Sequence, residues 1–485
     1  MSLAVLAADP ARRTSAVRTR LALPVGVLGV VVGVLLPWRA AMHTGVFDDT
    51  FWHRAAGVWM LDHHAVMRHD VFSYTVTGRS WITPEWGYGV LLAGSVRLVG
   101  PVALWLLSAG VASLTVLCVA VRARMKGAGW LWSGLLCVET GAAITLFLDD
   151  RPQVVSYFFV ALLLLGLTYA RRRPGVLWAV PVLFAFWANL HGSFLLGLAV
   201  LALEVGQAWR PGHIGRLSVS DPLPRRTAGL ALGGAALATF VNPFGPRVYE
   251  SALGVSFNST VRKFIGEWQS PDFHDPATLA VVVVPVVITV AWLVLSERPV
   301  PAGDLVLAGL LLVATLDAAR FMPYFAIAWC GLAASCPPVP ERLRPTLLAW
   351  PLGAVLALAM VQGPWTAPGK PATSVPVGAV SYLETHPGRV FSTYLWNDYL
   401  DWKGIPVFID GRTELYTGTP VFGEYLALLN MTTNPDPILD RYGVRYVLWQ
   451  PETSLSVYLS HDPSWRLVRR SQLSLLFEHT GGADR

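Results

Sequence analysis

Long apolar stretches alternate with short polar segments along the chain, up to about residue 362. An α-helix needs about 20 mainly apolar residues to cross the hydrocarbon core of a bilayer, and by that measure the pattern predicts about eleven membrane-spanning helices. Several of them are short. The predicted spans cover residues 21–41, 101–121, 129–148, 153–170, 175–190, 192–209, 227–244, 277–296, 303–318, 320–336 and 346–362.

Arginine and lysine are concentrated in every second connection between these stretches. The N-terminal segment holds Arg12, Arg13, Arg18 and Arg20, and basic runs recur at 122–126 and 171–173. Cytoplasmic loops of membrane proteins carry an excess of basic residues. We therefore expect a cytoplasmic N-terminus at 1–20, an uncleaved first span and, after an odd number of spans, a C-terminal part outside the cytoplasm.

Two of the predicted outer loops are long. The first covers residues 42–100 and contains an amphipathic stretch at 51–61 and a short apolar stretch at 86–99. The second stretch is short for a span, and we expect a helix lying in the membrane interface. The other long outer loop covers 244–276.

The last 120 or so residues differ from the rest. From Gly363 onward, acidic and basic residues are mixed, and the segment 363–369 is rich in proline and glycine. Strand-like runs at 389–396, 405–410, 443–449 and 465–478 alternate with helix-like runs at 376–386, 422–431 and 453–460. This alternation is typical of a small α/β domain. We expect an α-helical polytopic membrane domain at 21–362 and an extracytoplasmic α/β domain at 363–485.

Composition supports a membrane protein. Hydrophobic residues make up 54% of the chain and charged residues only 14%, and the mean hydropathy is +0.49. Soluble domains carry about 25% charged residues, so the values exclude an ordinary cytosolic enzyme. The net charge of +6 follows from basic cytoplasmic loops, and we expect no nucleic-acid partner. The four cysteines lie in or beside apolar runs and are expected to be packing residues.

Candidate chemistry begins just after the first predicted span, where Asp48 and Asp49 stand among aromatic residues. A carboxylate beside a lipid surface loses hydration, and a like-charged neighbour raises its affinity for protons. Such a group can act as a general base or bind a divalent cation. The alternative is a polar loop in which an Asp caps the following helix.

The order of these features resembles the GT-C superfamily of polytopic glycosyltransferases, which use polyprenyl-phosphate-linked sugars. The run Asp49-Thr50-Phe51-Trp52-His53-Arg54 is similar to the first-loop Asp motif of oligosaccharyltransferase catalytic subunits. Further short motifs resemble bacterial GT-C-like membrane proteins. They are Gly78-Arg79-Ser80-Trp81, Pro84-Glu85-Trp86, Arg151-Pro152-Gln153, the run 187–192, Asn242-Pro243-Phe244-Gly245, the run 267–271 and Phe408-Ile409-Asp410-Gly411-Arg412.

The resemblance implies an inverting sugar transfer from a polyprenyl-phosphate donor to a cell-envelope glycan, glycolipid or protein. Asp49 would take the acceptor proton and fits the motif better than Asp48. His53 and Arg54 belong to the same motif and would contact substrate. A divalent cation, Mg or Mn, would be held by Asp49, Asp150 and Glu267.

Other polar residues at outer boundaries are candidates for binding substrate. Each also has a structural explanation. Asp149 and Asp150 suit a solvated loop, and Arg151 suits an ion pair with one of them. Asn189 and His191 suit helix–helix contacts, Asn242 a turn, Trp268 interfacial anchoring, and Arg320 snorkelling or a pair with Asp317. For the lipid phosphate, Arg262 and Lys263 are alternatives to Arg320. The candidates are Asp149, Asp150, Arg151, Asn189, His191, Asn242, Glu267, Trp268 and Arg320.

A polar cluster in the C-terminal part is a weaker candidate for an acceptor site. Ligands of open α/β sheets bind at strand ends. Turns and local ion pairs explain the same residues. The cluster comprises Tyr394, Trp396, Asn397, Asp398, Asp410, Arg412 and Glu414.

Two other functions remain open from the sequence. Glu139 and Glu204 lie inside predicted spans, and carboxylates within a membrane suggest proton-coupled transport, here of a lipid-linked sugar. A transporter is expected to show internal repeats, and none is visible. The third possibility is a non-catalytic scaffold that binds envelope glycans.

Overall fold

A computed structural model describes residues 10–43, 45–46, 49–209, 212–219, 222–256, 262, 265–335 and 366–481. Asp48, Lys263 and the predicted span 346–362 lie outside these residues. Within them, each of the other ten predicted spans overlaps a helix. The run 227–244 is only partly helical, because the chain leaves the helix before Asn242-Pro243.

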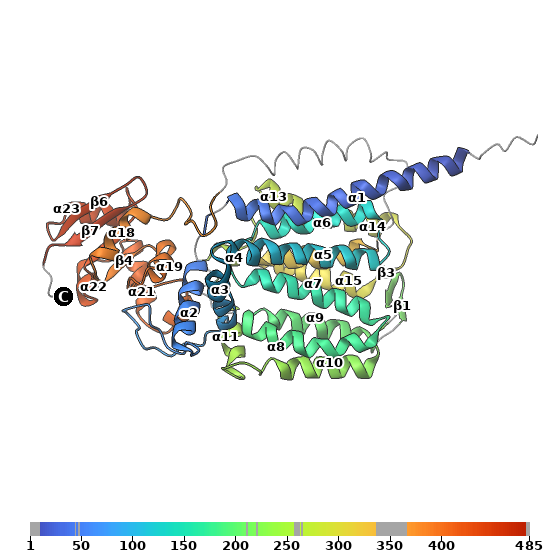
Figure 1. Ribbon diagram of the computed structural model, residues 1–485, viewed down its shortest axis with the longest axis horizontal. Coiled ribbons are helices and arrows are strands. Elements are labelled where there is room, and N and C mark those ends of the chain that lie inside the picture. Colours follow the sequence, from blue (N-terminus) through green and yellow to red (C-terminus); the bar gives the residue numbers. More distant parts are fainter. Residues whose placement is uncertain are drawn as a thin grey trace, which may run out of the picture.

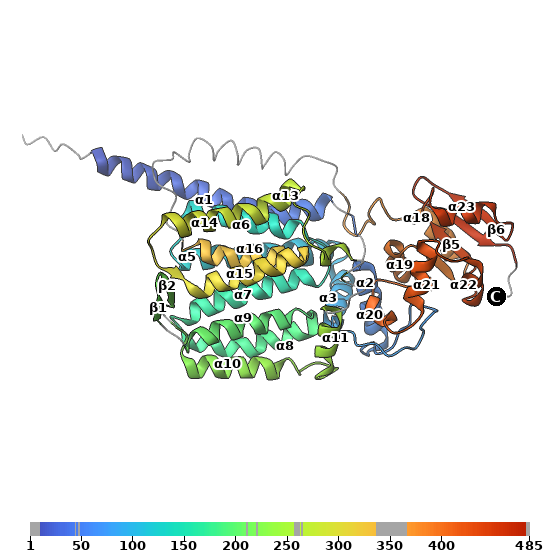
Figure 2. The same cartoon turned by 180° about the vertical axis from the view of Figure 1, so that it is seen from behind.

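The long helices lie side by side in one bundle (Figures 1 and 2). Several are interrupted by π or 3-10 turns but continue in the same direction. They are α1 (Pro10–His43), α4 (Val102–Trp105) with η1 (Leu106–Gly110) and α5 (Val111–Met125), α6 (Trp130–Thr145), α7 (Gln153–Ala170), η2 (Pro174–Ala179) with α8 (Val180–Leu190), α9 (Phe194–Gln207), α10 (Arg225–Ala238), α13 (Pro276–Thr278) with η4 (Leu279–Val283) and α14 (Val284–Leu295), α15 (Ala302–Asp317) and α16 (Met322–Ala333).

These helices make the chain a multi-pass membrane protein. Among the described residues, four helical segments are long and apolar enough to cross a bilayer: 25–43, 102–125, 153–170 and 276–295. Others, such as 174–190 and 194–207, are apolar but shorter. The total number of spans therefore stays a prediction.

Small residues allow α1 and α6 to approach closely. Gly26, Gly29 and Gly33 of α1 lie against the backbone of α6, where Gly134 and Gly141 face them in return. A methyl group at any of these positions would overlap backbone atoms of the other helix. Close contact through small residues is the usual way in which helices associate in lipid, where apolar burial offers no driving force.

The two ends of the bundle differ in character. At one end, Arg122 and Lys126 bind Asp304 at 2.8 and 2.5 Å, and Arg171 binds Glu204 at 2.8 Å. Glu204 is therefore part of an ion pair at this end. A small sheet lies here too, made of β1 (Gly212–Ile214), β2 (Leu217–Val219) and β3 (Val300–Pro301).

The opposite end is covered by short helices that run across the bundle (Figure 1). These are α2 (Thr50–His63), α3 (Trp86–Val99) and α11 (Arg247–Ser256), together with the turns η3 (Gly266–Trp268) and η5 (Ala319–Phe321). The expected amphipathic and interfacial helices of the first outer loop correspond to α2 and α3. The C-terminal region lies beyond them, on the same side.

The C-terminal region is a small α/β unit. Its sheet has the order β4-β5-β7-β6, with β4 and β5 parallel and the other pairs antiparallel. The strands are β4 (Val390–Ser392), β5 (Tyr446–Trp449), β6 (Trp465–Arg470) and β7 (Leu475–His479). The helices are α18 (Val377–Thr385), α19 (Tyr394–Trp402), α20 (Thr413–Tyr416), α21 (Val421–Leu429), α22 (Asp436–Arg441) and α23 (Ser454–His461).

Three predicted strands differ from the structure. The run 465–478 forms two antiparallel strands, β6 and β7, because the chain turns between Arg470 and Leu475. The run 389–396 is a strand only at Val390–Ser392, because α19 begins at Tyr394. The run 405–410 forms no strand of its own. It makes single bridges at Val407 to Ser73 and Val390, so its apolar side chains are buried by the first outer loop as well as by the sheet.

The first outer loop shares a core with the C-terminal region. Trp52, Met67 and Trp81 belong to one buried cluster with Phe391 and Phe408. A fully buried ion triad joins the same two parts: Arg412 binds Asp70 at 2.5 Å and Asp410 at 2.5 and 2.9 Å. The guanidinium also lies over the rings of Phe72 and Trp81.

Removal of this guanidinium should destabilise the protein. We expect Arg412→Ala to lower the free energy of unfolding by about 3–5 kcal/mol, because two buried carboxylates lose their counter-charge. Thermal unfolding in detergent micelles measures the effect. Arg441→Ala is the control, since Arg441 is 57% exposed in its pair with Glu424 and should cost about 1 kcal/mol or less. Equal losses in the two variants would contradict a structural role for the triad.

Candidate active site

Three loops far apart in the sequence meet at the covered end of the bundle, and Arg151 on one of them binds carboxylates of the other two. Its guanidinium binds Asp49 at 3.2 Å, Asp149 at 2.8 Å and Glu267 at 3.2 Å. Asp49 precedes α2, Arg151 precedes α7 and Glu267 lies in η3. The structure therefore brings together candidates from three of the predicted outer segments.

Glu267 connects Arg151 to a second guanidinium. Its other carboxylate oxygen lies 3.4 Å from Arg320, whose guanidinium stacks over Trp268 at 4.2 Å. Burial raises the pKa of Glu267, but Arg320 and Arg151 together outweigh it and hold that pKa below its usual value. Asp317 pairs with Arg262 at 2.7 Å instead of with Arg320. Trp268 is buried beneath Arg320, so it supports that side chain.

Asp49 is held on both oxygens. Trp52 donates its indole N–H to Oδ1 at 3.2 Å, and Arg151 donates to Oδ2 at 3.2 Å. Burial raises the pKa of Asp49 and the negative charge of Glu267 adds to this, while Arg151 opposes it. Although Asp49 is the residue before α2, its side chain makes no capping hydrogen bond to that helix. The explanation as a helix cap is therefore wrong for Asp49.

The C-terminal region reaches Asp49 through Gly411. A methyl group on Gly411 would lie 2.7 Å from Oδ1 of Asp49 and 2.8 Å from Oδ2 of Asp398. The backbone N–H of Gly411 donates to Oδ1 of Asp398 at 2.8 Å. Only glycine leaves room for both carboxylates here, so one wall of the site comes from the C-terminal region.

His53 and Arg54 are directed into the protein. His53 is buried, stacked on Trp52 at 3.6 Å between ring centroids and edge-on to Tyr88. Arg54 lies over the ring of Trp402 at 3.8 Å and so links α2 to α19. Their contacts among the described residues are packing contacts around Asp49.

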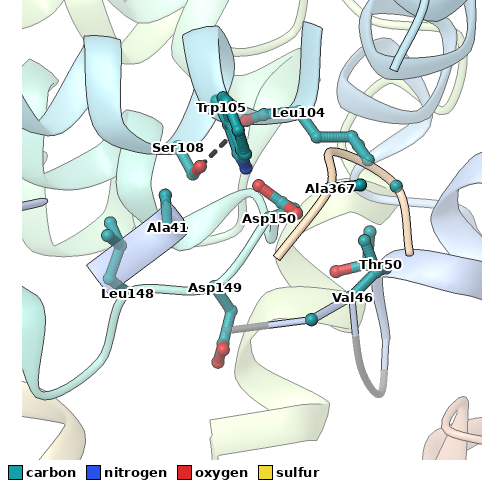
Figure 3. A pocket seen from close by; sticks show the side chains of 12 residues that line it. Ala41, Val46, Thr50, Leu104, Trp105, Ser108, Leu148, Asp149, Asp150 and Ala367 are labelled. Atoms are coloured by element: carbon teal, nitrogen blue, oxygen red, sulfur yellow. Dashed lines mark hydrogen bonds between the residues drawn. The ribbon is translucent and has the colours of Figure 1, made fainter. Parts of the chain in front are cut away.

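Asp149 and Asp150 point in different directions. Asp150 lies in a pocket beside Trp105 and Ser108, whereas the carboxylate of Asp149 points away from them (Figure 3). Burial raises the pKa of Asp150 to about 6, against a hydrogen bond from Ser108. The pocket wall includes the π turn η1, a local feature that often occurs at functional sites.

Asn189, His191 and Asn242 make different contacts. Asn189 accepts a hydrogen bond from Trp86 at 2.8 Å and thereby fixes the start of α3 to the end of α8. His191 contacts two serine hydroxyls, and its Nε2 atom lies 3.7 Å from Glu85. Asn242 bonds backbone groups of its own turn, as the turn explanation predicts.

Glu85 was missed as a site residue by reasoning from the sequence. Besides His191, it faces Asp49, Arg151, Arg320 and Glu414 electrostatically. Its signal was the Pro84-Glu85-Trp86 motif, which pointed to a resemblance but to no role. Of the C-terminal cluster, Asp398 reaches the site, whereas Asp410 and Arg412 form the buried triad. Trp396 is buried and donates to the carbonyl of Ser374.

A divalent cation stays a prediction. The three proposed ligands do not converge, because Asp49 and Glu267 both bind Arg151 while Asp150 lies in the pocket of Figure 3. The described residues contain no group of three or more His, Cys, Asp or Glu side chains arranged for a metal. We therefore derive no step through a metal.

Comparisons with known proteins support the fold. No protein-family model matches the sequence, and no curated protein matches it. The structure is similar to the oligosaccharyltransferase of Archaeoglobus fulgidus in the apo form, with a TM-score of 0.62, 12% identity and coverage of 90% of this chain and 70% of that one. The same enzyme with an inhibitory peptide and a dolichol-phosphate gives a TM-score of 0.60 at the same identity and coverage.

At 12% identity, this likeness shows the fold. It extends over 90% of this chain. The fold inferred from the first-loop motif and the later short motifs is therefore confirmed: the chain is a helical multi-pass membrane protein with the GT-C fold and a small C-terminal α/β region.

Proposed function

We propose that the protein is a membrane glycosyltransferase that moves a sugar from a polyprenyl-phosphate donor to an acceptor outside the cytoplasm, with inversion. The observation that carries this proposal is the meeting of Asp49, Arg151, Glu267 and Arg320 at one end of the bundle. It combines a desolvated carboxylate with two guanidinium groups. Proton removal and stabilisation of a phosphate leaving group require these two kinds of side chain.

The reaction would be a single displacement. The acceptor hydroxyl oxygen attacks the anomeric carbon, and the bond from that carbon to the phosphate oxygen breaks. Asp49 takes the hydroxyl proton, and the bonding electron pair leaves with the polyprenyl phosphate. Arg320, the predicted phosphate ligand, would bind this anion. Trp52 and Arg151 hold the Asp49 carboxylate in one orientation, which favours proton transfer along a fixed direction.

The charge distribution supports the side on which this site would lie. Arg122, Lys126 and Arg171 are at the end of the bundle opposite Asp49. Basic residues favour the cytoplasmic side. The proposed topology places the N-terminus in the cytoplasm and the site and C-terminal region outside, in the cytoplasmic membrane of a bacterium. Cell-envelope glycans, glycolipids and proteins are the acceptors reached from there.

The alternatives have less support. Of the two carboxylates that suggested proton-coupled transport, Glu204 pairs with Arg171 at the proposed cytoplasmic end, so an arginine already compensates its charge. A scaffold that only binds glycans would not need a desolvated carboxylate fixed between Trp52 and Arg151. A scaffold should also keep its function when this carboxylate is neutralised.

Neutralising Asp49 should therefore abolish turnover. With protein in lipid nanodiscs, labelled polyprenyl-phosphate sugars and crude envelope acceptor, we expect Asp49→Asn to consume donor about 100- to 10,000-fold more slowly than wild type, the usual contribution of a general base. Parallel reactions with EDTA test the cation. Asp62→Asn is the control, because Asp62 is on the helix that follows Asp49 but pairs with Arg97 at the surface. Equal rates for wild type and Asp49→Asn would refute the assignment of Asp49.

A methyl group on Gly411 should act on the same carboxylate from the other side. We expect Gly411→Ala to lower kcat by about 100-fold, because the methyl group would displace Asp49 or Asp398 by a substantial fraction of an ångström. Gly423→Ala is the matched control, since a methyl group there meets nothing within 4 Å. The measurement is donor consumption under saturating donor. A Gly411→Ala enzyme as fast as Gly423→Ala would show that the wall beside Asp49 is not part of the working site.

A further inference from the structure

A second hollow lies in the C-terminal region, beside the carboxyl end of β5. It is an open groove of about 500 Å³ between α23 and the turn that joins β6 to β7. Pockets that bind small ligands have volumes of about 300–1,000 Å³. Figures 1 and 2 show α23 and β6 at the end of the C-terminal region that lies away from the bundle. The groove is therefore separate from the candidate active site.

Four polar side chains of the groove keep atoms available for a ligand. Glu452, Arg470 and Gln472 are exposed, and their side chains make no hydrogen bond or ion pair within the part of the chain that the structure describes. His461 shares a hydrogen bond of 2.8 Å between Nδ1 and the carbonyl of Val457. A carbonyl can only accept, so Nδ1 is the donor and Nε2 of the neutral ring is left as an acceptor.

The backbone holds Glu452 in a conformation that glutamate rarely adopts. Its φ is +60°, in the left-handed region where the Cβ atom comes too close to the following carbonyl oxygen. Glycine would make the same turn between β5 and α23 without this cost. Strained residues of this kind cluster at ligand sites, where the side chain has a use that offsets the strain. The strain is a second observation, independent of the hollow, that points to a role for this carboxylate.

The available groups favour a ligand that carries hydroxyl groups. Glu452 and Nε2 of His461 accept hydrogen bonds. Arg470 donates them, and the amide of Gln472 does both. An anion would be repelled by Glu452 and a cation by Arg470. A sugar hydroxyl donates and accepts, so it can pair with each of these groups, and the opposite charges of Glu452 and Arg470 favour a saccharide without net charge.

The apolar part of the lining is small, which disfavours a peptide. It comes from Pro451, Val457 and Leu475; Val457 is exposed and Leu475 belongs to the buried core of the region. Protein ligands gain most of their affinity from a few large side chains buried in well-packed pockets. These three residues offer a shallow apolar surface instead, which suits the C–H face of a sugar ring.

We propose that this groove binds an uncharged saccharide chain through Glu452, His461, Arg470 and Gln472, and that it holds the acceptor glycan at a distance from the reacting hydroxyl. The second statement rests on the proposed function, because it assumes that a glycan is the acceptor. A chain held at one point reaches a second site on the same protein at a raised effective concentration. Such a contact acts on the KM for a long acceptor rather than on kcat.

Binding is measured first, without turnover. Full-length protein in nanodiscs is applied to an array of bacterial envelope oligosaccharides and to a peptide array, and the retained oligosaccharide is then titrated. We expect wild type to bind uncharged oligosaccharides. Glu452→Gly and Arg470→Ala should each weaken this binding by about 10- to 100-fold, because each removes a charged hydrogen-bonding group. Arg441→Ala is the matched control, since Arg441 is exposed in the same region but pairs with Glu424 outside the groove.

The glycine variant separates binding from folding. Glycine adopts a φ of +60° without steric cost, so Glu452→Gly should unfold at a temperature equal to or above that of wild type while it loses affinity for the saccharide. Thermal unfolding in the same nanodiscs measures this. A lower unfolding temperature with unchanged saccharide affinity would show that Glu452 has a structural role alone.

Three binding results would overturn the proposal. The first is a wild type that retains no saccharide, and the second is one that retains only charged saccharides or peptides. The third is an affinity of Glu452→Gly and Arg470→Ala equal to that of Arg441→Ala.

Transfer assays separate the groove from the proposed function. We expect Glu452→Gly to raise the KM for a long acceptor glycan by about 10-fold or more, and by less for a short one. Saccharide binding that is lost in Glu452→Gly, in a wild type that transfers no sugar, would support the groove and refute the transferase. Transfer that depends on Asp49, with one KM for long and short acceptors in wild type and Glu452→Gly, would do the reverse.

Discussion

One guanidinium group organises the site. Arg151 binds carboxylates that lie 102 residues before it, 2 residues before it and 116 residues after it. The planar fork of arginine can donate to several carboxylates at once, which a lysine ammonium does with less fixed geometry. Because these carboxylates sit on loops, and loops are the mobile parts of most folds, their common partner fixes Asp49 relative to the bundle. The helices across the bundle end and the placement of Glu267 beside Arg320 depend on this junction.

The membrane bundle supplies only part of that site. Its helices end in the loops that carry Arg151, His191 and Arg320, while α2 and the segment 64–85 belong to the same buried core as the C-terminal region. Gly411 completes the surroundings of Asp49 from that region. The site therefore lies at a boundary between lipid-embedded helices and a water-exposed α/β unit. Such a boundary suits a substrate with a lipid chain at one end and a polar group at the other.

Much of the fold followed from the sequence, because a bilayer imposes a length and polarity on each helix. Residues 153–170 and 303–318 illustrate this, since their helices agree with the apolar runs within a residue or so. The small strands were harder to predict. Residues 405–410 have the pattern of a strand, but in the structure a loop covers them and they form no strand of their own. The first-loop carboxylate was found from its motif. Its contact with Arg151, and the contact of Arg151 with Glu267, were out of reach, because each joins positions more than 100 residues apart. Glu85 was missed because its importance comes from His191 and Glu414, which only the fold brings near.

The ion triad has a consequence for biosynthesis. Asp70 and Arg412 are separated by 342 residues, so a ribosome that adds about 5–20 residues per second needs roughly 20 to 70 s to make the second after the first. In the proposed topology, the first loop crosses the membrane during that interval, while Asp70 has no counter-charge. The aromatic residues around it, including Trp81, have no core to join. The nascent chain must therefore keep this loop hydrated and protected from proteases until its last quarter emerges, which makes late arrival of the C-terminal region the vulnerable step of assembly.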